Sequence, residues 1–231
     1  MNPGSVLLAG ATGLVGGRVL ERLLAPPQGP QVLAPVRRPL TIPSPRLFAP
    51  VVELGDAGQD LALREQLRGA SPQIGSYLCC LGTTIRRAGS REAFLAVDRD
   101  LVLRLAAIAL ELGARQAILV SSVGASAQSG NFYLRVKGET ERALADLGFE
   151  RLDLLRPGLL LGNRTESRPG EAIARRLSPV TNPLLRGPLR RYRGIAADDV
   201  AAAAVALVGL GGPGRHVHEN AGLLALASSQ G

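Results

Sequence analysis

A tyrosine stands four residues before a lysine in NFYLRVKGE, residues 131–139. Positions i and i+4 share one face of a helix, so Tyr133 and Lys137 can point the same way. A neighbouring ammonium favours the phenolate, which brings a phenol into range for proton exchange with a carbonyl or an alcohol. Lys137 is also the single lysine among 27 Lys and Arg residues, which suggests that an amine is needed there.

Two serines precede this pair, at the end of the predicted strand 117–122. A hydroxyl of Ser121 or Ser122 beside Tyr133 would hold the oxygen of a substrate, and the sequence does not choose between them. We predict a catalytic site from these four residues. The alternative is a tyrosine that packs and a lysine that is solvated.

A glycine-rich turn, GATGLVGG, directly follows the first predicted strand, and a predicted helix follows the turn. Glycines let backbone N–H groups approach a pyrophosphate, and the N-terminus of the helix adds partial positive charge. We therefore predict that the turn binds a dinucleotide, with a plain structural turn as the alternative. The residues assigned to it are Gly10, Ala11, Thr12, Gly13, Leu14, Val15 and Gly16.

The segment after the second predicted strand bears on the choice of cofactor. No acid occurs between Glu21 and Glu53, whereas Arg37 and Arg38 can bind a phosphate. NADP(H) is therefore favoured over NAD(H), although the two arginines also fit an ordinary solvated loop. Asp56 could accept a hydrogen bond from the adenine amino group or form an Asx turn.

The order of the elements predicts an α/β fold. Strands are expected at 5–9, 31–36, 50–54, 76–81, 117–122 and 151–156, and helices at 14–25, 60–69, 91–113, 133–147 and 198–209. This alternation indicates a Rossmann-like, doubly wound parallel sheet, whose ligands bind beyond the carboxyl ends of the strands. At that edge we expect Leu81, Gly82 and Thr83 to lie against the cofactor.

A single domain is expected over residues 1–231, with a nucleotide-binding core at about 1–160 and a small substrate-side region at about 161–231. The basic segment 184–194 could be a lid over an anionic substrate or a mobile loop. Residues 216–218, HVH, are expected to form a short strand, and an apolar tail follows them. A homodimer is left open.

Composition excludes several classes of function. Only 3% of residues are aromatic, which argues against a nucleic-acid partner despite the net charge of +8. The adjacent Cys79 and Cys80 point to opposite faces of a strand, so we expect reduced thiols and a cytoplasmic location. No stretch predicts a signal peptide or membrane insertion. His216 and His218 lack a third clustered ligand, so no metal site is expected.

These motifs resemble a known superfamily. GATGLVG, LGTT, VSSVGA, YLRVK and LLRPGLLLG are similar to segments of the short-chain dehydrogenases/reductases. Within that superfamily, CCLGTTIRRAGSREAFLAVDRD, NFYLRVKGETE and RPGLLLGNRTESRPGE resemble the Tat-interactive-protein-like oxidoreductases, an atypical branch. The resemblance covers most of residues 5–175.

The resemblance implies an NADP-binding Rossmann domain in which Tyr133 exchanges the proton, Lys137 lies beside it and a serine assists. It also implies that Arg168 lies near the cofactor. Asp98 is a departure, because many short-chain dehydrogenases carry an asparagine there that helps a proton relay.

We therefore expect an NADP-dependent oxidoreductase of the carbonyl reductase or alcohol dehydrogenase type, acting on a small carbonyl or alcohol substrate. Two alternatives are an NADPH-binding regulator or sensor with weak or lost catalysis, and an NAD(P)-dependent epimerase or dehydratase.

Overall fold

Seven parallel strands form one sheet in the computed structural model, which describes residues 4–53, 56–71, 73–162 and 187–229. The strand order, β3-β2-β1-β4-β5-β6-β9, places β1 to β3 on one side of a switch point and β4 to β9 on the other. This order confirms the Rossmann-like, doubly wound sheet. The strands are β1 (Ser5–Ala9), β2 (Val32–Leu33), β3 (Leu47–Phe48), β4 (Ile74–Cys79), β5 (Gln116–Val120), β6 (Arg151–Arg156) and β9 (Gly214–Glu219).

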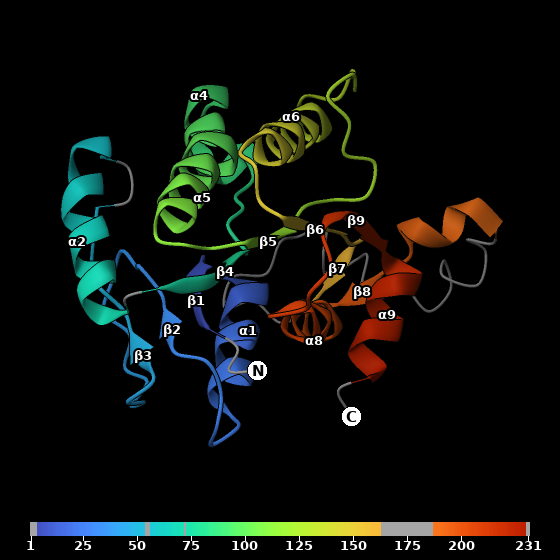
Figure 1. Ribbon diagram of the computed structural model, residues 1–231. Helices are drawn as coiled ribbons and strands as arrows, with labels where there is room; N and C mark the ends of the chain where they lie inside the picture. The colour runs from blue at the N-terminus through green and yellow to red at the C-terminus, as the bar shows by residue number, and fades with distance from the viewer. Residues whose placement is uncertain (1–3, 54–55, 72, 163–186, 230–231) are drawn as a thin grey trace.

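Helices cover both faces of the sheet (Figure 1). α1 (Leu14–Leu24) and α8 (Ala197–Leu207) lie on one face, and α2 (Asp60–Ala70), α5 (Val102–Glu111) and α6 (Phe132–Asp146) lie on the other. None of the described helices is both long and apolar enough to span a membrane. The remaining, shorter elements are η1 (Ala57–Gln59), α3 (Ile85–Ala88), α4 (Arg91–Leu95), η2 (Ala96–Leu101), β7 (Leu160–Leu161), η3 (Gly187–Tyr192), β8 (Ile195–Ala196) and α9 (Asn220–Ser228).

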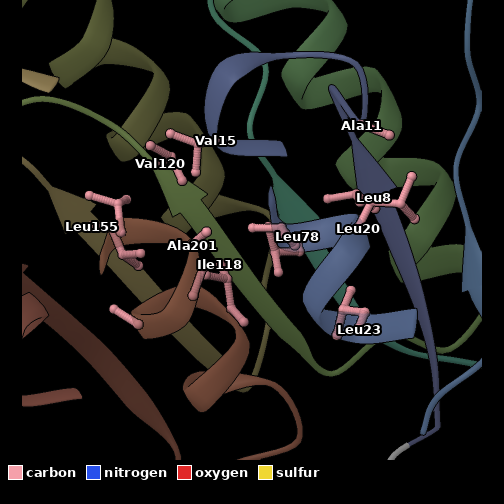
Figure 2. Close-up of a cluster of buried hydrophobic side chains, with 14 of the residues drawn as sticks. Leu8, Ala11, Val15, Leu20, Leu23, Leu78, Ile118, Val120, Leu155 and Ala201 are labelled. Atoms are coloured by element: carbon pink, nitrogen blue, oxygen red, sulfur yellow. The ribbon is translucent and has the colours of Figure 1, made fainter. Parts of the chain in front are cut away.

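The core has two parts because side chains alternate between the faces of each strand. Leu8 of β1 faces α1 and α8, whereas its neighbour Leu7 faces α2 and α5. Figure 2 shows the first part, in which apolar side chains of β1, β4, β5 and β6 meet those of α1 and α8. Each fully buried leucine contributes about 1.5–3 kcal/mol relative to an exposed one.

The third strand was predicted at the wrong place. Residues 50–54 were expected to form it, but Leu47 and Phe48 pair with Val32 and Leu33, and Val51 makes only an isolated bridge. Proline explains the difference, because Pro35 and Pro50 have no N–H group to donate to a regular ladder. The same interruption shortens β2 to two residues.

The helix predicted over 91–113 is divided into α4, a π-helical segment η2 and α5. The wider π turn changes the backbone hydrogen bonding, and side chains bind two carbonyls of this region. Thr140 of α6 donates to the carbonyl of Asp98 at 3.1 Å. Tyr77 of β4 donates to the carbonyl of Val102 at 2.9 Å. Asp98 is thereby held with its side chain fully buried.

The C-terminal residues contribute to the main sheet. β9 pairs in parallel with β6, and the apolar tail expected after HVH forms α9, which packs on α8. Asp153 of β6 is buried at this end. Burial would raise the pKa of its carboxyl, but hydrogen bonds from His218, Arg151 and Gln116 outweigh burial and lower this pKa to about 2. His218 therefore has a structural partner, Asp153.

The turn between β1 and α1 depends on two glycines. Gly10 adopts a φ of 85°, which L side chains rarely adopt, and a Cβ there would lie 2.8 Å from the carbonyl carbon of Cys80. A Cβ on Gly16 would lie 2.1 Å from the Gly10 carbonyl oxygen. The first turn of α1 can therefore press against the end of β1 only if position 16 has no side chain.

Gly16→Ala is expected to destabilise the protein by about 2 kcal/mol or more, because the backbone it meets cannot move aside cheaply. Gly17→Ala is the matched control, since the nearest atom to its Cβ would be 3.7 Å away. We expect Gly17→Ala to stabilise the helix by roughly 0.5–1 kcal/mol. Urea unfolding of both variants checks this prediction, and equal midpoints would contradict it.

Candidate functional site

The glycine-rich turn lies at the carboxyl edge of β1, next to the turn that follows β4. A Cβ on Gly10 would lie 2.9 Å from the backbone nitrogen of Leu81, so these two turns touch. Gly13 occupies the N-cap position of α1 and has no side chain that could cap the helix. The N–H groups of the first helical turn are therefore available to an anion. Ala11, Thr12, Leu14 and Val15 complete this turn and the start of the helix.

Tyr133 and Lys137 lie in the first half of α6, as the sequence predicts. Asn131 caps this helix by accepting a hydrogen bond from the backbone nitrogen of Leu134 at 3.2 Å. Tyr133 is partly buried, and its ring packs against Phe94 of α4 with 5.8 Å between ring centroids. Phe94 was not expected from the sequence, and its contact fixes the position of the tyrosine ring.

Lys137 is buried and forms an ion pair with Asp98. Its Nζ lies 2.7 Å from Asp98 Oδ1, and the two side chains are 5% and 0% exposed. Burial alone would lower the pKa of Lys137, but attraction to Asp98, and then to Tyr133 and Cys79, outweighs burial and raises this pKa above its ordinary value. Lys137 is therefore held as an ammonium.

The LGTT turn after β4 lies against this ion pair. The backbone nitrogen of Thr83 donates to Asp98 Oδ2 at 2.8 Å. A Cβ on Gly82 would lie 3.6 Å from Asp98 Oδ1 and 3.7 Å from Lys137 Nζ. Contacts thus run from the glycine-rich turn through Leu81 and Gly82 to the lysine, and they join the two halves of the site predicted from the sequence.

The two serines after β5 differ in their partners. Ser121 is buried and donates to Glu141 Oε1 at 2.6 Å. Glu141 is 1% exposed, and its carboxylate also pairs with Arg156 and Arg215. Ser122 is partly buried, and the hydrogen bond recorded for its hydroxyl is a long one, 3.4 Å to the carbonyl of Val123. Ser121 therefore belongs to a structural network, whereas the Ser122 hydroxyl is only weakly engaged.

Sequence reasoning missed the Glu141 network, although one signal for it was present. Glu141 follows Lys137 by four residues, so both lie on the same face of α6. Its partners come from the ends of β5 and β6 and from β9, and they could not be identified before the sheet order was known.

The residues assigned to the far end of the cofactor lie at the sheet edge near β2 and β3. Arg37 and Arg38 follow β2 and are exposed. Asp56 forms the Asx turn weighed above, because its Oδ1 accepts from the backbone nitrogen of Gly58 at 2.8 Å. Arg168 lies outside the described residues.

The described arrangement combines an anion-binding helix end, a phenol and a buried ammonium. The glycine-rich turn fits a pyrophosphate, because it leads into a helix N-terminus without a side-chain cap, whose N–H groups can donate to an anion. Tyr133 can exchange a proton, and Lys137 can donate hydrogen bonds but, while it is charged, cannot act as a base. The chemistry available is proton transfer at the same edge of the sheet as a helix end that can hold an anion.

Comparison with known proteins identifies relatives for most of the chain. Protein fmp52 of Emericella nidulans is 38% identical over 173 residues, which are 74% of this chain and 73% of that protein. Protein HTATIP2 of Rattus norvegicus is 38% identical over 175 residues, 74% of this chain and 69% of that protein. No model of a protein family matches the chain.

The names of these relatives correct one prediction. The fmp52 proteins of Emericella nidulans, Aspergillus clavatus and Saccharomyces cerevisiae are named as mitochondrial proteins, which contradicts the cytoplasmic location expected above. Reduced cysteines indicate the redox conditions around a protein and do not identify the compartment.

A solved structure, MoeE5 in complex with UDP-glucose and NAD, shares the fold with a TM-score of 0.67. It is 17% identical, and the match covers 98% of this chain and 82% of that one. At this identity the likeness shows the Rossmann-like fold alone. The identity to the two sequence relatives shows more: the chain belongs to the family of the fmp52 and HTATIP2 proteins.

Proposed function

We propose that this protein is an NADP-dependent oxidoreductase that reduces a small carbonyl compound or oxidises the corresponding alcohol. One observation carries the proposal: Tyr133 and the buried Lys137 share a helix face beside the LGTT turn, which touches the glycine-rich turn. A bound nicotinamide dinucleotide would supply or accept the hydride. In this proposal residues 1–231 form a single NAD(P)-binding domain.

The proposed roles follow from chemistry and burial. Tyr133 gives a proton to the carbonyl oxygen as the carbon is reduced, and takes it back in the reverse direction. Lys137 donates hydrogen bonds as an ammonium from the same face of α6 as the tyrosine. Gly10, Gly13 and Gly16 let backbone N–H groups approach the pyrophosphate.

Ser122 is the serine that we assign to the substrate oxygen. Ser121 already donates a hydrogen bond to Glu141. Removing this bond would leave a buried carboxylate oxygen without that partner, which would cost free energy. The hydroxyl of Ser122 can rotate to a ligand at little cost, because its present hydrogen bond is long.

An epimerase or dehydratase acting on a nucleotide sugar is the second candidate. The observation that favours it is the fold shared with MoeE5, whose structure holds UDP-glucose and NAD. Product analysis separates the two candidates, since an epimerase returns its dinucleotide unchanged and a reductase consumes NADPH. NADPH binding with no turnover over a panel of aldehydes, ketones and quinones would favour a sensor protein instead.

Tyr133→Phe is expected to lower turnover by about 100-fold or more, because it removes the proton that the carbonyl oxygen receives. NADPH affinity should stay within about twofold, since a phenyl ring keeps the contact with Phe94. Steady-state rates and NADPH titration measure the two effects. Tyr192→Phe, which removes a hydroxyl from an exposed ring, is the control. Undiminished turnover of Tyr133→Phe would refute the proposed role.

Ser122→Ala is expected to lower kcat by about tenfold or more and to leave stability nearly unchanged. Ser121→Ala should do the reverse, with a loss of roughly 1–3 kcal/mol in the free energy of unfolding because Glu141 loses a buried hydrogen bond. Rates at a temperature where both variants are folded, together with urea unfolding, provide the test. A larger loss of kcat in Ser121→Ala would assign the role to the other serine.

Arg37→Ala and Arg38→Ala should each raise the Kd for NADPH by about tenfold and leave the Kd for NADH unchanged, because only NADPH carries the 2′-phosphate. Arg115→Ala controls for loss of positive charge, since Arg115 is exposed and precedes β5, away from the carboxyl edge. Parallel titrations of both cofactors measure the effect. Equal affinity of the parent protein for NADPH and NADH would overturn the NADP assignment.

A further inference from the structure

Asp98 and Lys137 form an ion pair that no other pair of the described residues matches in burial. Their charged atoms lie 2.7 Å apart, and the side chains are 0% and 5% exposed. The second oxygen of Asp98 accepts from the backbone nitrogen of Thr83, and its backbone carbonyl accepts from Thr140. The carboxylate is thus fixed to η2, to α6 and to the LGTT turn.

Burial opposes the positive charge of Lys137, and ionisable groups on three elements favour it. Asp98 of η2, Tyr133 of α6 and Cys79 of β4 are the ionisable groups that act on it. Cys79 is fully buried, and burial is the largest influence on its thiol, whose pKa is raised. A neutral thiol gives little support to a neighbouring charge, which leaves Asp98 as the counter-ion of Lys137.

We propose that Asp98 is a positioning residue, which keeps Lys137 a charged hydrogen-bond donor and directs it toward the LGTT turn. An ammonium without its partner would be an unpaired buried charge, and such groups usually lose their proton. Asp98 prevents this loss, because its carboxylate lies 2.7 Å from Nζ and balances the charge. The N–H groups of the ammonium can then donate to a ligand.

The positive charge limits the chemistry of the single lysine in the chain. A charged amine has no lone pair, so Lys137 acts neither as a nucleophile toward a carbonyl nor as a base. Asp98 itself contacts neither substrate nor cofactor in this assignment. It acts through Lys137 on one side and through Thr83 on the other.

The single lysine allows a direct test on the protein without ligand. Protein labelled with ¹³C at the lysine Cε gives one lysine signal in NMR, whose chemical shift follows the protonation of Lys137. In the parent protein this signal should keep its ammonium position up to about pH 10. In Asp98→Asn, the midpoint of titration should fall by at least about one pH unit, because burial is no longer offset by a carboxylate.

Asp100→Asn is the matched control. It removes the same charge from the same short segment, but Asp100 is about half exposed and pairs with Arg99. Its lysine midpoint should equal that of the parent. An Asp98→Asn midpoint within about 0.3 pH units of the parent would overturn the proposal. So would a parent midpoint below about pH 9, and this result does not depend on whether any variant folds.

The consequence for binding rests on the proposed function and is measured separately. In Asp98→Asn, NADPH affinity should fall by about tenfold or more as the pH rises through the lysine midpoint, whereas the parent should show no such step. If the parent does not bind NADPH, the proposed function fails. The lysine titration still decides the role of Asp98 in that case. A step of equal size in parent and variant would refute the positioning role.

Discussion

Lys137 and Glu141 carry opposite charges, buried one helical turn apart on α6, and these charges determine how the carboxyl edge of this sheet is assembled. Lys137 requires an anion and Glu141 requires cations, because unpaired charges in a protein interior cost several kcal/mol each. Asp98 meets the first need, and Arg156, Arg215 and the Ser121 hydroxyl meet the second. Removing one partner from such a pair typically costs 3–5 kcal/mol. Compensation of these charges therefore ties α6 to η2, to the ends of β5 and β6, and to β9.

Close backbone approach is the second requirement, and glycines meet it at three contacts. Gly10 lies against the end of β4, Gly16 lies against the carbonyl of Gly10, and Gly138 lies against the loop after β5. A Cβ on Gly138 would be 2.2 Å from the carbonyl carbon of Ser126, so α6 could not sit beside this loop with any other residue there. These contacts place the turns within reach of the charged pair.

The sequence predicts the parts of this fold that depend on local pattern. The periodicity of apolar residues gave most helices and strands within a few residues, and the i, i+4 spacing put Tyr133 and Lys137 on one helix face. Local pattern could not predict the π segment, because Thr140 and Tyr77, which hold the widened turn, are distant in the sequence.

Features that depend on tertiary contacts were likewise out of reach. Ser121 and Ser122 are chemically identical in the sequence, and only the position of Glu141 on α6 distinguishes them. In the sequence, Asp98 stands out only as a departure from the asparagine of many short-chain dehydrogenases. In the structure its buried carboxylate is the ion-pair partner of Lys137. The strand at 47–48 escaped detection because its position depends on pairing with a strand that Pro35 cuts short.

The basic segment 184–194, which the sequence left open between a lid and a mobile loop, is described from residue 187 onward. Asn220, at the start of α9, donates to the carbonyl of Arg193 at 2.7 Å and accepts from the backbone nitrogen of Gly158 at 2.8 Å. A Cβ on Gly158 would lie 2.2 Å from that same carbonyl oxygen. The end of the segment is therefore fastened to the turn after β6 by a buried side chain. This contact fixes the point from which the chain enters β8, where Ile195 pairs with Leu160.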